Sequence, residues 1–173
     1  MQSAVSIARA LYRIAFRGGT PQRIQYRSGL LFAGIFVFLL SSSIVGRYLY
    51  GLTFIEIGLA LFTFLSGIYL AVALLTRKVV RARLRLSLQS LFLLLAAVHC
   101  LLLLLLPAAP YLPWLPLAAG LTALVIVLMG TTNILQFARG GTRARAAIET
   151  LALAAALGAF YSILRSLLET VFS

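Results

Sequence analysis

Five long apolar stretches, separated by short polar or basic segments, set the pattern of the chain. Each is close to the length of about 20 residues that an α-helix needs to cross a bilayer, so the pattern predicts five transmembrane helices. The predicted spans are residues 29–45, 52–75, 86–106, 117–138 and 146–164. The core of the fifth is rich in alanine, which gains little from lipid. Four spans followed by a C-terminal helix on the membrane surface is therefore the alternative.

The composition agrees with this pattern. Of the 173 residues, 62% are hydrophobic and 10% are charged, and a soluble domain of this size cannot bury so much apolar surface. We therefore expect an all-α polytopic membrane protein, with a transmembrane helical bundle at residues 29–173 and a basic segment at residues 1–28. The first apolar stretch begins too late and runs too long for an ordinary cleaved signal peptide, so residue 1 is expected to be mature.

The N-terminal segment separates basic from apolar side chains. On a helix, one stripe carries Arg9, Arg13 and Arg17, and the other side carries Ile7, Leu11 and Ile14. This pattern is typical of an amphipathic helix that lies in the membrane interface. The alternative is a partly ordered basic tail that only sets the topology.

The distribution of basic residues predicts the topology. A cytoplasmic N-terminus places all 15 Lys and Arg residues except Arg47 and Arg165 on the cytoplasmic side, as the positive-inside rule requires. The C-terminus is then outside, and the membrane is expected to be a bacterial inner membrane. The longest cytoplasmic loop is expected to contact anionic headgroups or an acidic partner through Arg77, Lys78, Arg81, Arg83 and Arg85.

A single carboxylate, Glu56, interrupts the second apolar stretch. On a helix it shares one stripe with the small or polar residues Thr53, Ala60, Thr63 and Gly67. Such a stripe lets a neighbouring helix approach closely, so Glu56 is expected to face another helix rather than lipid. The structural interpretation is an ion pair or hydrogen bond between helices, with Arg47 and Arg165 as candidate partners. The functional interpretation is a proton or cation relay.

Other polar residues fall within or beside the later spans. His99 shares a helical face with Gln89 in the third span. Asn133 and Gln136 lie near the cytoplasmic end of the fourth span, and Glu149 begins the fifth. Glu149 is expected to be a carboxylate at a helix end, accompanied by Arg145 or solvent. The alternative is a hydrogen bond from Asn133 or Gln136 to Glu149, since consecutive antiparallel helices are usually neighbours.

The fifth span also carries a surface of small residues: Ala152, Ala155, Ala156, Gly158 and Ala159. Small side chains let helix backbones approach closely in lipid, where there is no hydrophobic force between helices. We expect this surface to pack tightly, either within the bundle or against another protein.

The titratable residues are few. The chain has three acidic residues, one histidine and one cysteine, on separate elements, and their spacing matches no metal site, phosphate loop or catalytic motif. We expect no metal, no cofactor and no enzymatic activity, although a lipid-directed membrane enzyme stays a minor alternative. Nucleic acid is not an expected partner, because the arginines follow the topology.

These features favour a scaffold, accessory or assembly subunit that associates with anionic lipid and with other membrane proteins or further copies of itself. Lateral packing through the second and fifth spans is the expected mechanism. The competing interpretation is a small carrier or channel in which Glu56, His99 and Arg165 converge on a polar path in the outer half of the membrane.

Overall fold

The computed structural model describes residues 3–76 and 80–172. Every regular element in these two segments is a helix. The elements are α1 (Ala4–Phe16), the short 3-10 helix η1 (Pro21–Arg23), α2 (Ser28–Tyr48), α3 (Phe54–Thr76), α4 (Arg81–Leu103), the 3-10 helix η2 (Leu106–Tyr111), α5 (Leu115–Arg139) and α6 (Arg143–Phe172). Arg77 and Lys78, both predicted to contact lipid or an acidic partner, lie outside the described residues.

Five of these helices, α2 to α6, are long and apolar enough to cross a membrane, in agreement with the five predicted spans. The chain therefore has the make-up of an integral membrane protein. The predicted boundaries are wrong in two spans. Helix α4 begins at Arg81 and ends at Leu103, rather than covering 86–106, and α6 continues to Phe172 instead of ending at residue 164.

These boundaries have two physical causes. Hydropathy detects only an apolar core, whereas arginine favours helix well enough to extend α4 at its start and α6 at its end beyond that core. At its other end α4 meets Pro107 and Pro110, which cannot supply the amide donors of an α-helix, and the chain turns into η2 instead.

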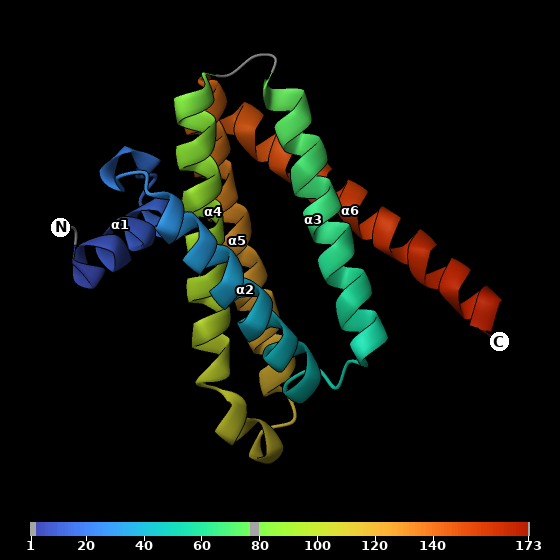
Figure 1. The fold of residues 1–173 in the computed structure, drawn as a ribbon. Coiled ribbons are helices and arrows are strands. Elements are labelled where there is room, and N and C mark those ends of the chain that lie inside the picture. Colours follow the sequence, from blue (N-terminus) through green and yellow to red (C-terminus); the bar gives the residue numbers. More distant parts are fainter. Residues whose placement is uncertain (1–2, 77–79, 173) are drawn as a thin grey trace.

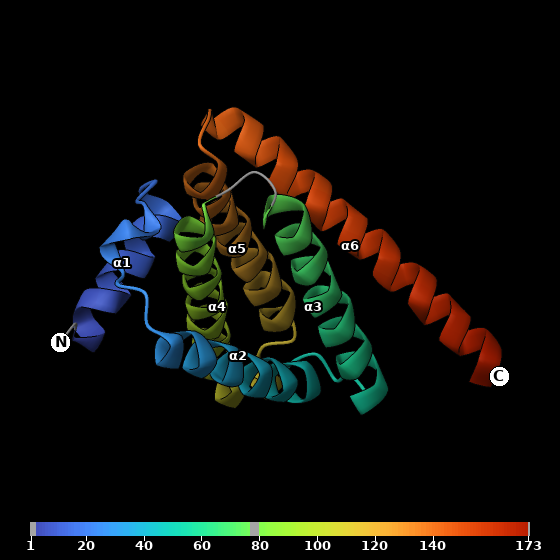
Figure 2. The ribbon, with the colours of Figure 1, turned by 45° about the horizontal axis from the view of Figure 1, so that its top comes forward.

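Helix α4 lies at the centre of the arrangement. It packs against α2 and α5 and is the most buried of the five long helices (Figure 1). Helix α6 packs against α5 and crosses to α3, whose contacts with α4 are few. Figure 2 shows α3 beside α6, with α2 leading from the side of α1 towards the start of α3. The second and fifth spans are therefore direct neighbours.

The end of α3, the start of α4 and the α5–α6 turn lie at the same end of the molecule, and the α2–α3 connection and η2 lie at the other (Figure 1). We call the first the basic end, because it carries the arginines that begin α4 and α6 and end α5. These are Arg81, Arg83, Arg85, Arg139, Arg143 and Arg145.

Helix α1 packs against α5 and, to a smaller extent, α4. Its start is capped by Ser3, whose hydroxyl accepts a hydrogen bond from the Ser6 amide. Leu11 and Ile14, on the apolar side of the predicted amphipathic helix, are buried in a cluster with Leu94 and Ile134. Part of the surface that the sequence analysis assigned to lipid is thus covered by protein.

Candidate functional site

Glu56 caps the start of α3. Its Oε2 accepts the backbone N–H of Thr53 at 2.8 Å and the Thr53 hydroxyl at 2.9 Å, while the Glu56 amide donates to Thr53 Oγ1 at 3.2 Å. This reciprocal arrangement is a capping box, in which two otherwise unpaired amides at a helix start are satisfied. A threonine followed three residues later by a glutamate is the ordinary sequence signal of a capping box, although this one was not predicted.

The second carboxylate oxygen of Glu56 faces α6. Glu56 Oε1 lies 3.6 Å from Nη2 of Arg165, one of the two candidate partners suggested by the sequence. The other candidate, Arg47, instead donates to the Leu52 carbonyl at 3.4 Å and lies over the Phe54 ring. Glu56 thus has a structural arrangement that combines a helix cap with a contact between α3 and α6.

The rest of the α3 stripe has more than one environment. Thr63 and Gly67 are buried, and Ala60 is half-buried. A methyl group added at Gly67 would overlap the side chain of Leu157 on α6, so the absence of a side chain at this position allows the close approach. Ala60 instead lines a cavity together with Phe38 and His99. Gly67 is therefore occupied by a partner within the same chain.

The small-residue surface of α6 has the opposite environment. Ala152, Ala155, Ala156, Gly158 and Ala159 are all exposed, whereas Leu153, Ala154 and Leu157 face the neighbouring helices. No described atom lies within 4 Å of the position that a Gly158 side chain would occupy. We call these five exposed residues the α6 small-residue face.

His99 lies away from the Glu56–Arg165 pair. Its Nδ1 is 2.9 Å from the Leu95 carbonyl oxygen, and its ring packs edge-on against Phe38, with 5.1 Å between ring centroids. Because a carbonyl only accepts, Nδ1 carries the proton in this contact. Neither Glu56 nor Arg165 is among the described residues that line the cavity beside His99. The described contacts therefore do not bring these three residues together.

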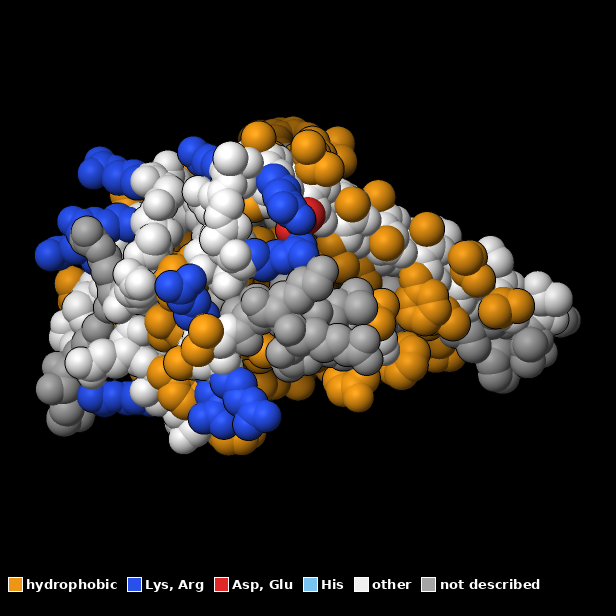
Figure 3. Space-filling model, turned by 90° about the horizontal axis from the view of Figure 1, so that it is seen from above, with side chains coloured by type: hydrophobic (Ala, Val, Ile, Leu, Met, Phe, Trp, Pro, Cys, Tyr) orange, Lys and Arg blue, Asp and Glu red, His pale blue; other side chains and the backbone are white. Residues whose placement is uncertain are grey.

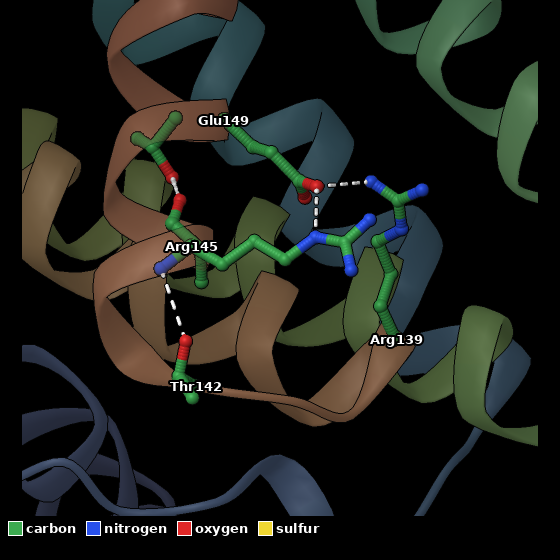
Figure 4. Close-up of polar contacts among 6 residues, drawn as sticks. Arg139, Thr142, Arg145 and Glu149 are labelled. Carbon is green, nitrogen blue, oxygen red and sulfur yellow. Dashed lines mark hydrogen bonds and ion pairs between the residues drawn. The ribbon is translucent and has the colours of Figure 1, made fainter.

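Glu149 forms an ion-pair cluster at the basic end (Figure 4). Its Oε1 lies 2.7 Å from Nη1 of Arg139 and 3.2 Å from Nε of Arg145. Arg145 is the partner that the sequence favoured, while Arg139 was missed. The alternative hydrogen bond from Asn133 or Gln136 is wrong, because the two arginines that flank the α5–α6 turn occupy this carboxylate.

The turn that brings these arginines together has a clear local cause. Gly140 and Gly141 adopt positive φ angles of 71° and 105°, which side chains disfavour. Thr142 then caps α6, with its hydroxyl accepting the Arg145 amide at 3.4 Å. The paired glycines thus end α5 and form the turn to α6.

Asn133 and Gln136 serve different neighbours. The Asn133 side-chain amide donates to the Ile14 carbonyl near the end of α1 at 2.6 Å, and Gln136 donates to the Gly141 carbonyl at 3.4 Å. Asn133 is buried, and its contact ties α1 to α5. Nothing in the local sequence indicates this pairing, because the two residues are 119 positions apart.

Gln89 fastens the segment that leads into α2. It is fully buried, its Oε1 accepts the Arg27 amide at 2.8 Å, and its Nε2 donates to the Gln25 carbonyl at 3.0 Å. One side chain therefore satisfies two backbone groups more than 60 residues away. The sequence analysis placed Gln89 on the face of His99 but assigned it no role.

Basic side chains gather on the surface of the basic end (Figure 3). Arg81, Arg83 and Arg85 are exposed in the first turns of α4, where no acidic residue and no side-chain cap is present. Because a helix start carries partial positive charge, these arginines reinforce its attraction for anions. Arg9 and Arg17 on α1 are also exposed, and Arg13 is half-buried.

Two apolar cavities lie between the helices. The first, of about 290 Å³, is lined by α3, α4, α5 and α6 and reaches from Leu84 and Ala138 to Phe64. The second, of about 390 Å³, lies towards the opposite end and is lined by residues that include His99 and Tyr50. Burial raises the pKa of the Tyr50 phenol. Phe64, Leu124 and Val127 line both cavities, so the two adjoin.

Among the described residues, no three His, Cys, Asp or Glu side chains lie close enough together to hold a metal ion.

Comparison with known proteins found no matching family model, no matching curated protein and no matching solved structure. The class of the protein follows from its helices alone, which are those of a polytopic integral membrane protein.

Proposed function

We propose that the protein is a non-enzymatic scaffold, accessory or assembly subunit of a bacterial inner membrane. In this proposal α2 to α6 form a transmembrane bundle, with the N-terminus in the cytoplasm and the C-terminus outside. The protein associates laterally with other membrane proteins or with further copies of itself, and its basic end contacts anionic headgroups.

The exposure of the α6 small-residue face is the observation that carries this proposal. Helices associate in lipid by close backbone approach, and a helix that exposes these five small residues offers a surface for such an approach. On α3, Gly67 already packs against Leu157 of α6, so this position supports the fold rather than an external contact. The lateral partner is therefore assigned to the α6 small-residue face.

The charge distribution supports the proposed orientation. The arginines of the basic end and of α1 face the cytoplasmic surface under the positive-inside rule, while Arg47 and Arg165 belong to the opposite end. Exposed Tyr111 and Trp114 lie around η2 at that opposite end, as aromatic side chains do at membrane interfaces.

An interfacial position of α1 belongs to the same proposal. Its inner side is buried against α5, but Val5, Tyr12 and Phe16 are exposed in one stripe together with Arg9. Arg17 lies over the Tyr12 ring at 5.8 Å. A mixture of exposed aromatic and basic side chains suits the headgroup layer, so α1 is proposed to lie in it while remaining docked on α5.

The described contacts favour the scaffold over the carrier or channel. A polar path needs ionisable groups that converge, whereas Glu56 and Arg165 are paired between α3 and α6 and His99 contacts Leu95 and Phe38. The cavity beside His99 is lined mainly by apolar side chains. Glu56 is accordingly assigned a capping and packing role.

Matched glycine substitutions test the proposal. Gly158 and Gly58 are both exposed helical glycines, with no described atom within 4 Å of an added side-chain position. Gly158→Leu should weaken capture of partner chains in a mild-detergent pull-down of the intact protein, while Gly58→Leu should capture them as the wild type does. Equal capture by both variants, or a wild type that is monomeric and captures no membrane protein, contradicts the proposal.

A further inference from the structure

The cavity between α3, α4, α5 and α6 is almost wholly apolar and lies within helices of membrane-spanning length. Its walls include Leu84, Leu88 and Leu91 of α4, Ala138 of α5, and Ala154 and Leu157 of α6. A hydrocarbon occupant of this cavity, which has a volume of about 290 Å³, would gain van der Waals contacts along these side chains. Water is not held favourably against such an apolar lining.

We propose that this cavity binds one acyl chain of an anionic phospholipid, whose headgroup contacts the arginines at the start of α4. The inference rests on the membrane placement given under the proposed function, and it adds a defined lipid site to it. This site is distinct from the α6 small-residue face, because Ala154 lines the cavity and the adjacent Ala155 is exposed on the other side of α6.

The position of Arg81 supports an anionic headgroup. Arg81 shares a helical face with Leu84, Leu88 and Leu91, at spacings of three, four and three residues, so it stands beyond the apolar wall at the basic end. Among the described residues, the salt bridges of the basic end join Glu149 to Arg139 and Arg145, and none involves Arg81, Arg83 or Arg85. The arginines nearest the α4 wall therefore retain an uncompensated positive charge.

The dimensions suit a lipid chain that enters from one leaflet. On α5 the lining residues extend from Leu124 to Ala138, about 21 Å at the rise of an α-helix. One leaflet contributes about 15 Å, half of the hydrocarbon thickness. The adjoining second cavity continues the apolar path beyond Phe64, so a chain longer than the first cavity is also accommodated.

Photolabelling tests the site in the intact protein, reconstituted in bilayers that contain phosphatidylglycerol with a mid-chain diazirine. Matched bilayers contain phosphatidylcholine with the same photoreactive chain. Peptide mapping by mass spectrometry should find adducts on cavity residues of α4 and α6, above all at Leu88, Leu91 and Leu153. Phosphatidylglycerol should label them more strongly, by about fivefold for each arginine that contacts the headgroup.

Two neighbouring substitutions separate this proposal from the proposed function. Ala154→Phe fills the cavity and should abolish cavity labelling while partner capture persists, whereas Ala155→Phe should weaken partner capture while labelling persists. Unchanged labelling in Ala154→Phe, absence of cavity adducts in the wild type, or equal labelling by the two lipids overturns the lipid site. If neither variant loses partner capture, the result counts against the scaffold role and leaves the lipid site standing. Circular dichroism and gel filtration of both variants establish that each is folded.

Discussion

Glu56 Oε2 accepts the backbone N–H of Thr53 at 2.8 Å, and this contact explains why a carboxylate begins a helix that is otherwise apolar. The same side chain accepts the Thr53 hydroxyl and points its other oxygen towards Arg165. The carboxylate therefore stabilises the start of α3 and contributes to its contact with α6.

Removing the Thr53 hydroxyl should destabilise the protein through the cap. Thr53→Val should lower the free energy of unfolding by about 1 kcal/mol, the usual loss on removing an N-cap side chain. Thr122→Val is the matched control, because the Thr122 hydroxyl donates only to the Ala118 carbonyl within α5. Denaturant unfolding in detergent micelles measures both. Equal stabilities of the two variants would show that the cap contributes nothing.

The Glu56–Arg165 contact should show a small favourable coupling energy. Glu56→Gln keeps an acceptor for the Thr53 amide but removes the charge, and Arg165→Gln removes the partner charge. Because both side chains are partly exposed, a double-mutant cycle should give only a weak favourable coupling. The cycle of Glu56→Gln with Arg47→Gln is the control and should give a smaller value. Coupling to Arg47 that equals or exceeds coupling to Arg165 would be inconsistent with the described pair.

The close approach of α3 to α6 depends on Gly67. Gly67→Leu should destabilise the protein by about 1 to 3 kcal/mol through overpacking against Leu157, and Leu157→Ala should recover part of that loss in the double variant. Gly58→Leu, at an open position of the same helix, should have little effect. Thermal unfolding in detergent provides the comparison. If the two leucine variants melt together, Gly67 is not at a helix contact.

Gln89 should control the docking of the segment before α2. Gln89→Leu leaves the Arg27 amide and the Gln25 carbonyl without this partner, which should lower stability by about 1 to 3 kcal/mol. Amide hydrogen exchange measured by mass spectrometry should accelerate in peptides that cover residues 25–27. Gln136→Leu is the matched control, since Gln136 makes only one long, exposed hydrogen bond, and its effect on the same peptides should be negligible. Unchanged exchange in Gln89→Leu would contradict the assigned role.

Features that depend on neighbouring residues could be predicted from the sequence, whereas contacts between distant helices could not. The five apolar helices followed from hydropathy, and the α5–α6 turn is readable from the paired Gly140 and Gly141. The capping box was equally readable from Thr53 and Glu56 but was overlooked, because Glu56 was interpreted only as a contact to another helix or as a relay. These features depend on residues that are close together in the sequence.

The remaining contacts depend on which helices become neighbours. Hydropathy gives the number of spans but not their arrangement, so it does not indicate that α6 crosses to α3 or that α2 packs on α4. The contacts of Gln89 with Gln25 and of Asn133 with Ile14 bridge residues 64 and 119 positions apart. For the same reason, the sequence did not show that Leu157 packs against Gly67 of α3 while the α6 small-residue face remains exposed.

The most direct test of the account is the location of the two ends of the chain. Reporter fusions at Met1 and Ser173, one active only in the cytoplasm and the other only outside it, determine whether the chain crosses the membrane an odd number of times. The account predicts a cytoplasmic signal at Met1 and an external signal at Ser173. Signals from the same compartment at both ends would contradict it.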